Sequence, residues 1–243
     1  MSWKIGLLGT GNVSSFWVAA FQNVPGCRIF VRGSNLKSSQ AFVEEHRLER
    51  LEANTEVDFY LVSVQDKNIQ SVLLELPKGV PIFISSALFN LQEANDPYCG
   101  VLYPLQTLRK ESLPLVTEVP FLCEFSEKIR PLAEEIISKL KLKVYYTDYN
   151  QRLQAHTVAV FINNFGYLVM KMGVNLLKGI PQEVLYPLIQ KTASNALINK
   201  DLQTGPAMRE DKDTMNKHRE LLNPEQRELY DFLSDYIRNH KAK

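Results

Sequence analysis

The sequence predicts an α/β fold in which an N-terminal doubly wound domain is followed by an all-helical C-terminal domain. Short apolar runs alternate with amphipathic segments through about residue 147, as in a parallel sheet covered by helices. After Thr147 only helical periodicity remains. Near the start, an apolar strand runs directly into a glycine-rich turn. We therefore expect two domains, which cover residues 1–147 and 148–243.

The glycine-rich turn follows a predicted strand, Trp3–Leu8, and precedes a predicted helix, Val13–Asn23. Glycines at the first and third turn positions allow a tight turn and a close approach to a pyrophosphate, whose charge would face the amides of the helix N-terminus. Ser14 occupies the third small position of this pattern. The alternative is a turn with a purely structural role. The predicted dinucleotide contacts are Gly9, Thr10, Gly11, Asn12 and Val13.

The residues after the second strand, Cys27–Val31, favour NADP over NAD. In this fold an acidic residue there binds the ribose 2′-hydroxyl of NAD, whereas a basic or hydroxyl residue accommodates the 2′-phosphate of NADP. This chain has Arg32 and Ser34 at that point, and no acid before Glu44. The alternative is that Arg32 is only a solvated loop charge.

Two further strands end in polar residues. The predicted strand Asp58–Val64 is apolar without a break from Phe59 to Val62, as expected for a parallel strand buried on both faces, and Pro81–Ser85 is another strand. Ligands of open α/β sheets bind at the carboxyl ends of the strands. Asp66 could instead cap the helix Asn68–Glu75, which is the commoner role. The predicted cofactor contacts at this edge are Val64, Gln65, Asp66 and Ser85.

The remaining elements complete the two domains. In the first, we expect a helix at Leu36–His46, strands at Cys99–Tyr103, Pro120–Glu124 and Val144–Thr147, and a helix at Glu127–Leu140. In the second, we expect helices at Gln151–Leu177, Gln182–Ile198, Ala207–Leu222 and Pro224–His240.

Composition excludes several classes of protein. The formal net charge of +1 gives no attraction to nucleic acid or to an acidic membrane surface. No uninterrupted run of 18 apolar residues occurs and no signal-peptide pattern opens the chain, so we expect a cytoplasmic protein without a membrane span. The three cysteines form no CxxC pair, and the four histidines lack zinc-ligand spacing. We expect buried thiols and no metal site.

The long predicted helix carries a polar stripe. At about 100° per residue, one sector contains His156, Asn163, Asn164, Tyr167 and Lys171. Histidine exchanges protons near neutral pH, an asparagine amide can orient a carbonyl or amide group, and Lys171 could bind a carboxylate. The alternative is an ordinary solvent-facing or interdomain surface.

A second candidate lies at Thr204-Gly205-Pro206, where a rigid turn opens a helix. Arg209 follows this turn and could bind a carboxylate or phosphate through two hydrogen bonds. Asp211, Thr214 and His218 share one face of the expected helix. A capped turn followed by a solvated face explains the same spacing.

Several motifs together resemble a known family. They are Gly9-Thr10-Gly11-Asn12-Val13, Val64 to Ile69, Tyr103-Pro104-Leu105-Gln106-Thr107, His156 to Phe161 with Asn164-Phe165, and Thr204-Gly205-Pro206 with Arg209. The chain resembles bacterial Rossmann-like proteins with a helical C-terminal domain of unknown function, which are labelled NADP oxidoreductases or deazaflavin-dependent oxidoreductase-like proteins. Wider relatives are pyrroline-5-carboxylate reductase, ketopantoate reductase, and the 6-phosphogluconate and 3-hydroxyacid dehydrogenases.

The resemblance implies a cofactor on the first domain, a small-molecule substrate in the interdomain cleft, and a homodimer formed through the helical domain. It supplies no substrate identity. The chain departs from the family pattern after the fourth strand, where Phe83-Ile84-Ser85-Ser86-Ala87 stands in place of His-Thr-Ser-Gly-Ala. A histidine and a glycine that could line the nicotinamide site are therefore missing.

These observations predict an NADP-dependent oxidoreductase that acts on a small carbonyl, imine or hydroxy compound. His156 would donate or accept a proton, Asn164 would position the reacting group, and Arg209 would hold a substrate carboxylate. The coenzyme, NADPH, would carry the hydride chemistry. The alternative is a non-catalytic NADP-binding sensor or scaffold, which the departures after the fourth strand favour.

Overall fold

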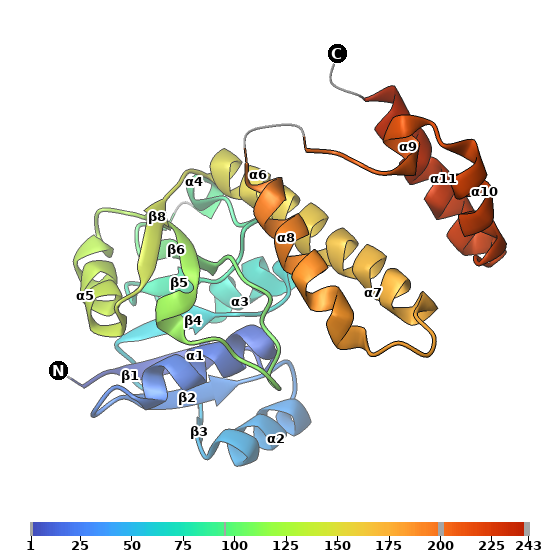
Figure 1. Cartoon of the computed structure of the whole chain (residues 1–243). Helices are drawn as coiled ribbons and strands as arrows, with labels where there is room; N and C mark the ends of the chain where they lie inside the picture. Colours follow the sequence, from blue (N-terminus) through green and yellow to red (C-terminus); the bar gives the residue numbers. More distant parts are fainter. Residues whose placement is uncertain (1, 95, 199–201, 241–243) are drawn as a thin grey trace. The chain divides into compact units, whose positions relative to one another are not determined.

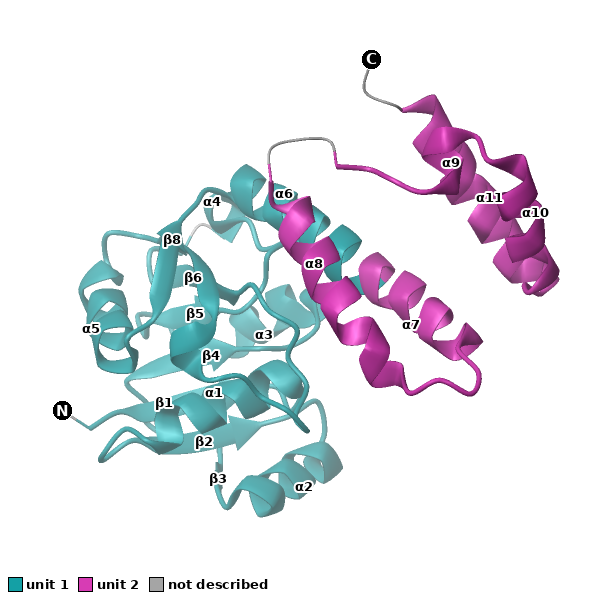
Figure 2. Cartoon of the chain, viewed as in Figure 1, with its two compact units in different colours: residues 1–164 teal, residues 165–243 magenta. Residues whose placement is uncertain are grey.

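The computed structural model describes residues 2–94, 96–198 and 202–240, and Figure 1 shows its helices and strands. It divides into two compact units, residues 1–164 and 165–243, which Figure 2 colours separately. The first unit contains the sheet, and the second is helical. The division falls within a long helical segment that begins at Tyr149, three residues after the last strand ends at Tyr146.

The first unit is built on an eight-stranded sheet with the order β3-β2-β1-β4-β5-β6-β7-β8. All neighbouring strands are parallel except β6 and β7, which are antiparallel. This order confirms the doubly wound fold, because the chain reverses direction across the sheet between β1 and β4. The strands are β1 Lys4–Leu8, β2 Arg28–Arg32, β3 Glu49–Arg50, β4 Phe59–Val62, β5 Ile82–Ile84, β6 Cys99–Pro104, β7 Pro120–Phe125 and β8 Lys143–Tyr146.

Helices cover both faces of this sheet (Figure 1). One buried cluster joins α1 and α5 to the sheet through residues such as Trp17 and Ile136, and a second includes Ile69 of α3. Burying each such large apolar side chain contributes about 1.5–3 kcal/mol. The helical elements of this unit are α1 Asn12–Gln22, α2 Leu36–His46, the short η1 Asp66–Asn68, α3 Ile69–Glu75, α4 Leu91–Ala94, η2 Val116–Glu118, α5 Arg130–Leu140 and α6 Tyr149–Ala159.

The second unit is entirely helical among its described residues, as predicted. One expected element, Ala207–Leu222, is wrong as a single helix, because Glu210 adopts a left-handed backbone with φ of +57°. Asp211 then starts a new helix by accepting a hydrogen bond from the Thr214 backbone N–H at 3.1 Å. The helices are α7 Gly166–Leu176, η4 Gln182–Leu185, α8 Tyr186–Ala196, α9 Pro206–Arg209, α10 Lys212–Glu220 and α11 Pro224–Asn239.

One helical segment runs from Tyr149 to Leu176 and contains a π-helical stretch, η3 Val160–Phe165, between α6 and α7. By length and composition alone it could cross a membrane, with a mean hydropathy of 1.3 in its most apolar window. Its first turns, however, carry Arg152, which is fully buried within the first unit. The start of this segment is therefore part of the sheet domain.

Arg152 fixes α6 to the sheet domain. Its guanidinium donates to Glu124 of β7 at 2.6 Å and to the backbone carbonyl of Phe89 at 2.7 Å. Its side chain is 0% exposed, and that of Glu124 is 21% exposed. An unpaired buried charge is costly, so this pair resists separation of α6 from β7. His156 lies four residues later, on the same helical face as Arg152.

We predict that Arg152→Ala lowers the free energy of unfolding by about 3 kcal/mol or more, because it leaves Glu124 without its partner. Urea unfolding monitored by circular dichroism measures this change. The matched control is Arg28→Ala, which removes an exposed arginine that pairs with Glu49 and should cost less than about 1 kcal/mol. Equal losses in the two variants would contradict an anchoring role for Arg152.

Candidate functional site

The glycine-rich turn lies at the carboxyl end of β1, beside the point where the strand order reverses. Gly9 has a φ of +117°, and a Cβ atom there would lie 2.5 Å from the carbonyl oxygen of Ser63. Its backbone N–H donates to the carbonyl of Arg32 at 2.9 Å. Only glycine fits this conformation without displacing the chain after β4. The turn is therefore fixed between the ends of β2 and β4.

The same turn leaves room for an anion. A Cβ atom built on Gly11 would meet nothing within 4 Å, and Gly11 is the N-cap of α1, where it has no side chain to cover the helix amides. The buried Ser14 hydroxyl has no hydrogen-bond partner among the described residues, and it lies 3.1 Å from the position of a Gly9 Cβ. These features fit a dinucleotide pyrophosphate.

The other predicted residues of the turn surround this space. Thr10 lies against the next strand-to-helix turn, because a Cβ on Gly33 would be 2.9 Å from the Thr10 methyl carbon. The Asn12 side chain is exposed and accepts a hydrogen bond from the Lys110 backbone N–H at 3.3 Å. Val13 is half-buried and packs on the core. Asn12 thus remains near the predicted phosphate position, whereas Val13 is mainly structural.

Two arginines line a cavity of about 330 Å³ beside the turn after β2. Arg32 ends β2 and pairs with Glu75 at 3.0 Å. Arg50 of β3 also lines the cavity and lies 3.5 Å from Glu52. Ser34 is exposed beside this turn. Both arginines are paired with exposed carboxylates, whose attraction is weak in water, so either guanidinium could turn towards a phosphate.

The residues after β4 and β5 are held by hydrogen bonds within the protein. Val64 packs on the second buried cluster, and Gln65 is exposed. The capping role for Asp66 is wrong: the residue lies inside η1, and its carboxylate accepts a hydrogen bond from the Ser86 hydroxyl at 2.6 Å. Ser85 accepts a hydrogen bond from the Trp17 indole N–H at 2.8 Å. Asp66 thus links the chain after β4 to the chain after β5, and Ser85 links the end of β5 to α1.

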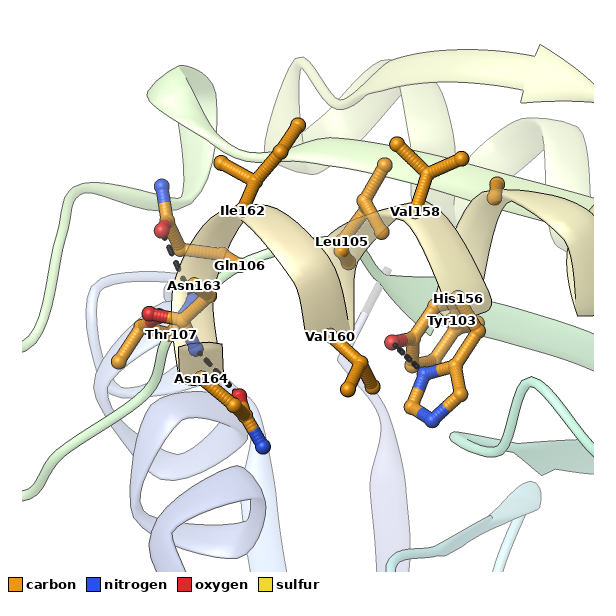
Figure 3. Close-up of a pocket in the computed structure, with 12 residues that line it drawn as sticks. Tyr103, Leu105, Gln106, Thr107, His156, Val158, Val160, Ile162, Asn163 and Asn164 are labelled. Atoms are coloured by element: carbon orange, nitrogen blue, oxygen red, sulfur yellow. Dashed lines mark hydrogen bonds between the residues drawn. The ribbon is translucent and has the colours of Figure 1, made fainter. Parts of the chain in front are cut away.

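A second cavity, of about 420 Å³, lies within the first unit between the end of β6 and the helical segment that starts with α6. Figure 3 shows the side chains around it. The predicted residues His156, Asn163 and Asn164 all line it. The chain after β6 completes it with Tyr103, Leu105, Gln106 and Thr107.

Tyr103 and His156 form a hydrogen-bonded pair in this cavity. The Tyr103 hydroxyl lies 3.0 Å from His156 Nδ1, and the two rings meet edge to face (Figure 3). Burial, and secondly the negative charge of Asp66, raise the pKa of the Tyr103 phenol. The phenol therefore stays protonated well above neutral pH and can donate to Nδ1. Nε2 of His156 is left for another partner.

The two asparagines lie in η3, where the helix widens. The Asn163 amide donates to the Asn164 side-chain oxygen at 3.1 Å, and both residues are exposed (Figure 3). π-Helical turns hold one residue more than α-helical turns and are frequent at functional sites. The assumption of 100° per residue fails here, so the predicted polar stripe does not continue regularly into α7. With Gln106, these asparagines give the cavity three carboxamide groups.

The remaining predicted residues belong to the second unit. Arg209 is the last residue of α9 and is exposed, and Tyr167 and Lys171 are exposed on α7. Asp211 caps α10, and hydrogen bonds from Thr214 lower the pKa of its carboxyl. His218 Nδ1 lies 3.0 Å from the Tyr230 hydroxyl. A role in substrate binding for Arg209 stays a prediction.

The cysteines lie apart from the cavity residues. Cys99 and Cys123 are buried in strands, and burial is the main cause that raises the pKa of each thiol to about 12. Cys27 is partly exposed. Among residues 2–94, 96–198 and 202–240, no cluster of three or more histidine, cysteine, aspartate or glutamate side chains is placed to hold a metal ion.

Comparison with known proteins agrees with this architecture. Residues 119–237 match the family described as Domain of unknown function (DUF2520). This stretch runs from the end of η2 to α11 and includes the helix that carries His156. The match confirms the predicted resemblance to Rossmann-like proteins with a helical C-terminal part. No curated protein matches the chain.

Solved structures match nearly the whole chain. Protein BF3122 from Bacteroides fragilis, named a putative NADP oxidoreductase, is 28% identical with a TM-score of 0.84, covering 98% of this chain and 99% of that one. The 1-pyrroline-5-carboxylate reductase of Streptococcus pyogenes is 16% identical with a TM-score of 0.61, covering 98% and 99%. An imine reductase variant from Myxococcus stipitatus, in complex with NAD⁺, is 17% identical with a TM-score of 0.62, covering 98% and 94%.

Sequence reasoning missed Tyr103 as a candidate functional residue. Tyr103 is quoted among the resembling motifs, but nothing in its spacing links it to His156, 53 residues later. The usable signal was its place at the carboxyl end of a strand, since that edge of an open α/β sheet binds ligands. Arg50 was missed because β3 has only two residues and no apolar pattern.

We predict that Asp66→Asn lowers the pKa of Tyr103 while leaving it above its ordinary value, because the contribution of burial remains. Carbon-13 NMR of ζ-labelled tyrosine measures this titration, and Tyr103→Phe identifies the resonance. The internal control is Tyr146, whose hydrogen bond to Glu134 is the main cause that raises its pKa to about 12 and is not altered by the substitution. An unchanged Tyr103 pKa would show that Asp66 does not act on this pair.

Proposed function

We propose that the protein is an NADP-dependent oxidoreductase that acts on a small carbonyl, imine or hydroxy compound. The observation that carries this proposal is the combination, within one unit, of a phosphate-compatible turn after β1 and a histidine-containing cavity after β6. The name of the Bacteroides fragilis structure supports the same activity and the preference for NADP. When bound, the coenzyme supplies the hydride chemistry.

We assign one set of residues of the first unit to the phosphate end of the coenzyme and another set to the reacting group. The Gly9–Gly11 turn and the first amides of α1 hold the pyrophosphate, and Arg32 with Ser34 holds the 2′-phosphate. In the cavity, Tyr103 donates to His156 Nδ1, so the proton of the neutral ring lies on Nε2. His156 Nε2 would then donate its proton to the oxygen or nitrogen of the reacting group while Nδ1 takes up the Tyr103 proton, so that the ring stays neutral and Tyr103 regains a proton from solvent. Asn164 orients the substrate.

Coenzyme binding tests the first half of the proposal. We expect NADPH to bind at sub-millimolar concentration, measured by its fluorescence on titration with protein, and to bind more tightly than NADH. Arg32→Gln should weaken NADPH binding about tenfold through loss of a charge-assisted contact, with little effect on NADH. Arg28→Gln is the matched control, because Arg28 lies at the opposite end of the same strand. Failure of both nucleotides to bind would overturn the proposal.

Measurement of turnover tests the second part of the proposal, which is the oxidoreductase activity. NADPH oxidation is followed with a panel of small aldehydes, ketones and cyclic imines, and His156→Ala should reduce the rate about 10²-fold or more through loss of proton transfer. Tyr103→Phe should retain more activity than His156→Ala. Binding of NADPH without turnover of any member would favour the alternative, a nucleotide-binding sensor or scaffold.

We also propose that the second unit forms a homodimer. Large apolar side chains are exposed on α7 and α8, including Tyr186 and Leu188, which are each 63% exposed. So many exposed large apolar side chains are uncommon on monomers, and a second copy of the chain offers the same apolar side chains in return.

Light scattering after size-exclusion chromatography should give a mass of twice 27.8 kDa for the wild-type protein. Leu188→Asp should shift the population towards the monomer, because it places a charge in the apolar contact. Leu74→Asp in the first unit is the matched control, since Leu74 is 81% exposed on α3 and should leave the mass unchanged. A monomeric wild-type protein would refute this assembly.

A further inference from the structure

The connection between β6 and β7 crosses the carboxyl edge of the sheet beside α1. We call residues 105–115 the strap. Leu108 of the strap is buried, and Leu113 packs on the main hydrophobic cluster, so both sides of its tip are fixed to the core. Residues 109–112 form the exposed tip, which carries Arg109 and Lys110. Figure 1 shows the strap in green, reaching the end of α1 that follows β1.

The strap tip is tied to the first residue of α1. The Lys110 backbone N–H donates to the Asn12 side-chain oxygen at 3.3 Å. Its side-chain ammonium lies 3.5 Å from a carboxylate oxygen of Glu45 on α2, and the Lys110 side chain is 53% exposed. The other charged groups at the tip are Arg109 and Glu111, which lie 3.9 Å apart. The tip thus brings Lys110 next to the turn that fits a pyrophosphate.

We propose that Lys110 is a coenzyme ligand whose ammonium neutralises the pyrophosphate held by the Gly9–Gly11 turn. This inference rests on the proposed function, because it requires that a dinucleotide bind at this turn. Lysine is a flexible point charge, so its ammonium can leave Glu45 without a change of the anchored backbone. An exposed lysine–carboxylate pair is worth little, whereas a phosphate beside uncapped helix amides offers stronger attraction.

The position of Lys110 makes its role distinct from that of Arg32. Both NADPH and NADH carry the pyrophosphate, whereas only NADPH carries the 2′-phosphate. Loss of the Lys110 charge therefore weakens both coenzymes equally, and loss of the Arg32 charge changes the preference between them. Glu45 competes with the phosphates for the ammonium, so removing the Glu45 charge should strengthen the binding of both coenzymes.

Fluorescence titrations with NADPH and NADH test this assignment. Lys110→Gln should weaken both coenzymes by the same factor, about five- to tenfold, and Glu45→Gln should tighten both. Lys128→Gln is the matched control, because the Lys128 ammonium lies 5.6 Å from the centre of the Tyr98 ring, and it should bind both coenzymes as the wild type does. Because Lys110 is exposed, thermal unfolding of the variant should match that of the wild type.

The outcomes separate this inference from the proposed function. If the wild-type protein binds both coenzymes and Lys110→Gln binds them with unchanged affinity, the inference is overturned and the proposed function stands. A loss confined to NADPH would also overturn it, since Lys110 would then contact the 2′-phosphate. If the wild type binds neither coenzyme, both proposals fail together.

Discussion

The buried ion pair between Arg152 and Glu124 is the interaction on which the candidate site depends. It joins the first helix after the sheet to β7 and leaves no part of the guanidinium in water. Separating the pair would cost several kcal/mol, so α6 cannot drift from the sheet. His156 follows one turn later and meets Tyr103 at the end of β6. The Arg152–Glu124 pair thus positions His156 at the cavity, although neither residue lines the cavity.

Most of the fold could be predicted from the sequence because its signals are local. The strand Phe59–Val62 is apolar throughout, and α2 begins at the capping residue Asn35 and covers Leu36–His46 as predicted. The features that the sequence did not predict depend on single residues or on pairing between distant segments. β3 exists because Glu49 and Arg50 pair with β2, and the break at Glu210 depends on one left-handed residue. Neither leaves a periodic pattern to detect.

The residues of the candidate site also fall into two groups: those that local sequence indicates and those that depend on distant contacts. The glycine turn and Arg32 are contiguous with the strands that position them, so local sequence is enough to propose them as coenzyme contacts. Three further candidates, Tyr103, Lys110 and Arg50, emerge only from contacts with residues far away in the sequence: His156, Asn12 and Val31, respectively. No local sequence pattern encodes such contacts. The predicted stripe on the long helix starts at His156, which lines the cavity, and its regular spacing ends at η3, because the π-helical stretch changes the angle between successive residues.

The phosphate end of the site is defined more completely than the reacting end. The glycine conformations and the buried Ser14 hydroxyl, which has no hydrogen-bond partner among the described residues, fit a pyrophosphate at this turn. The cavity at His156 instead offers one proton-exchanging group and three neutral carboxamides among its described residues. Such groups recognise a polar, uncharged part of a substrate. A carboxylate on the substrate would need a cation from elsewhere, because no lysine or arginine is among the described residues that line the cavity.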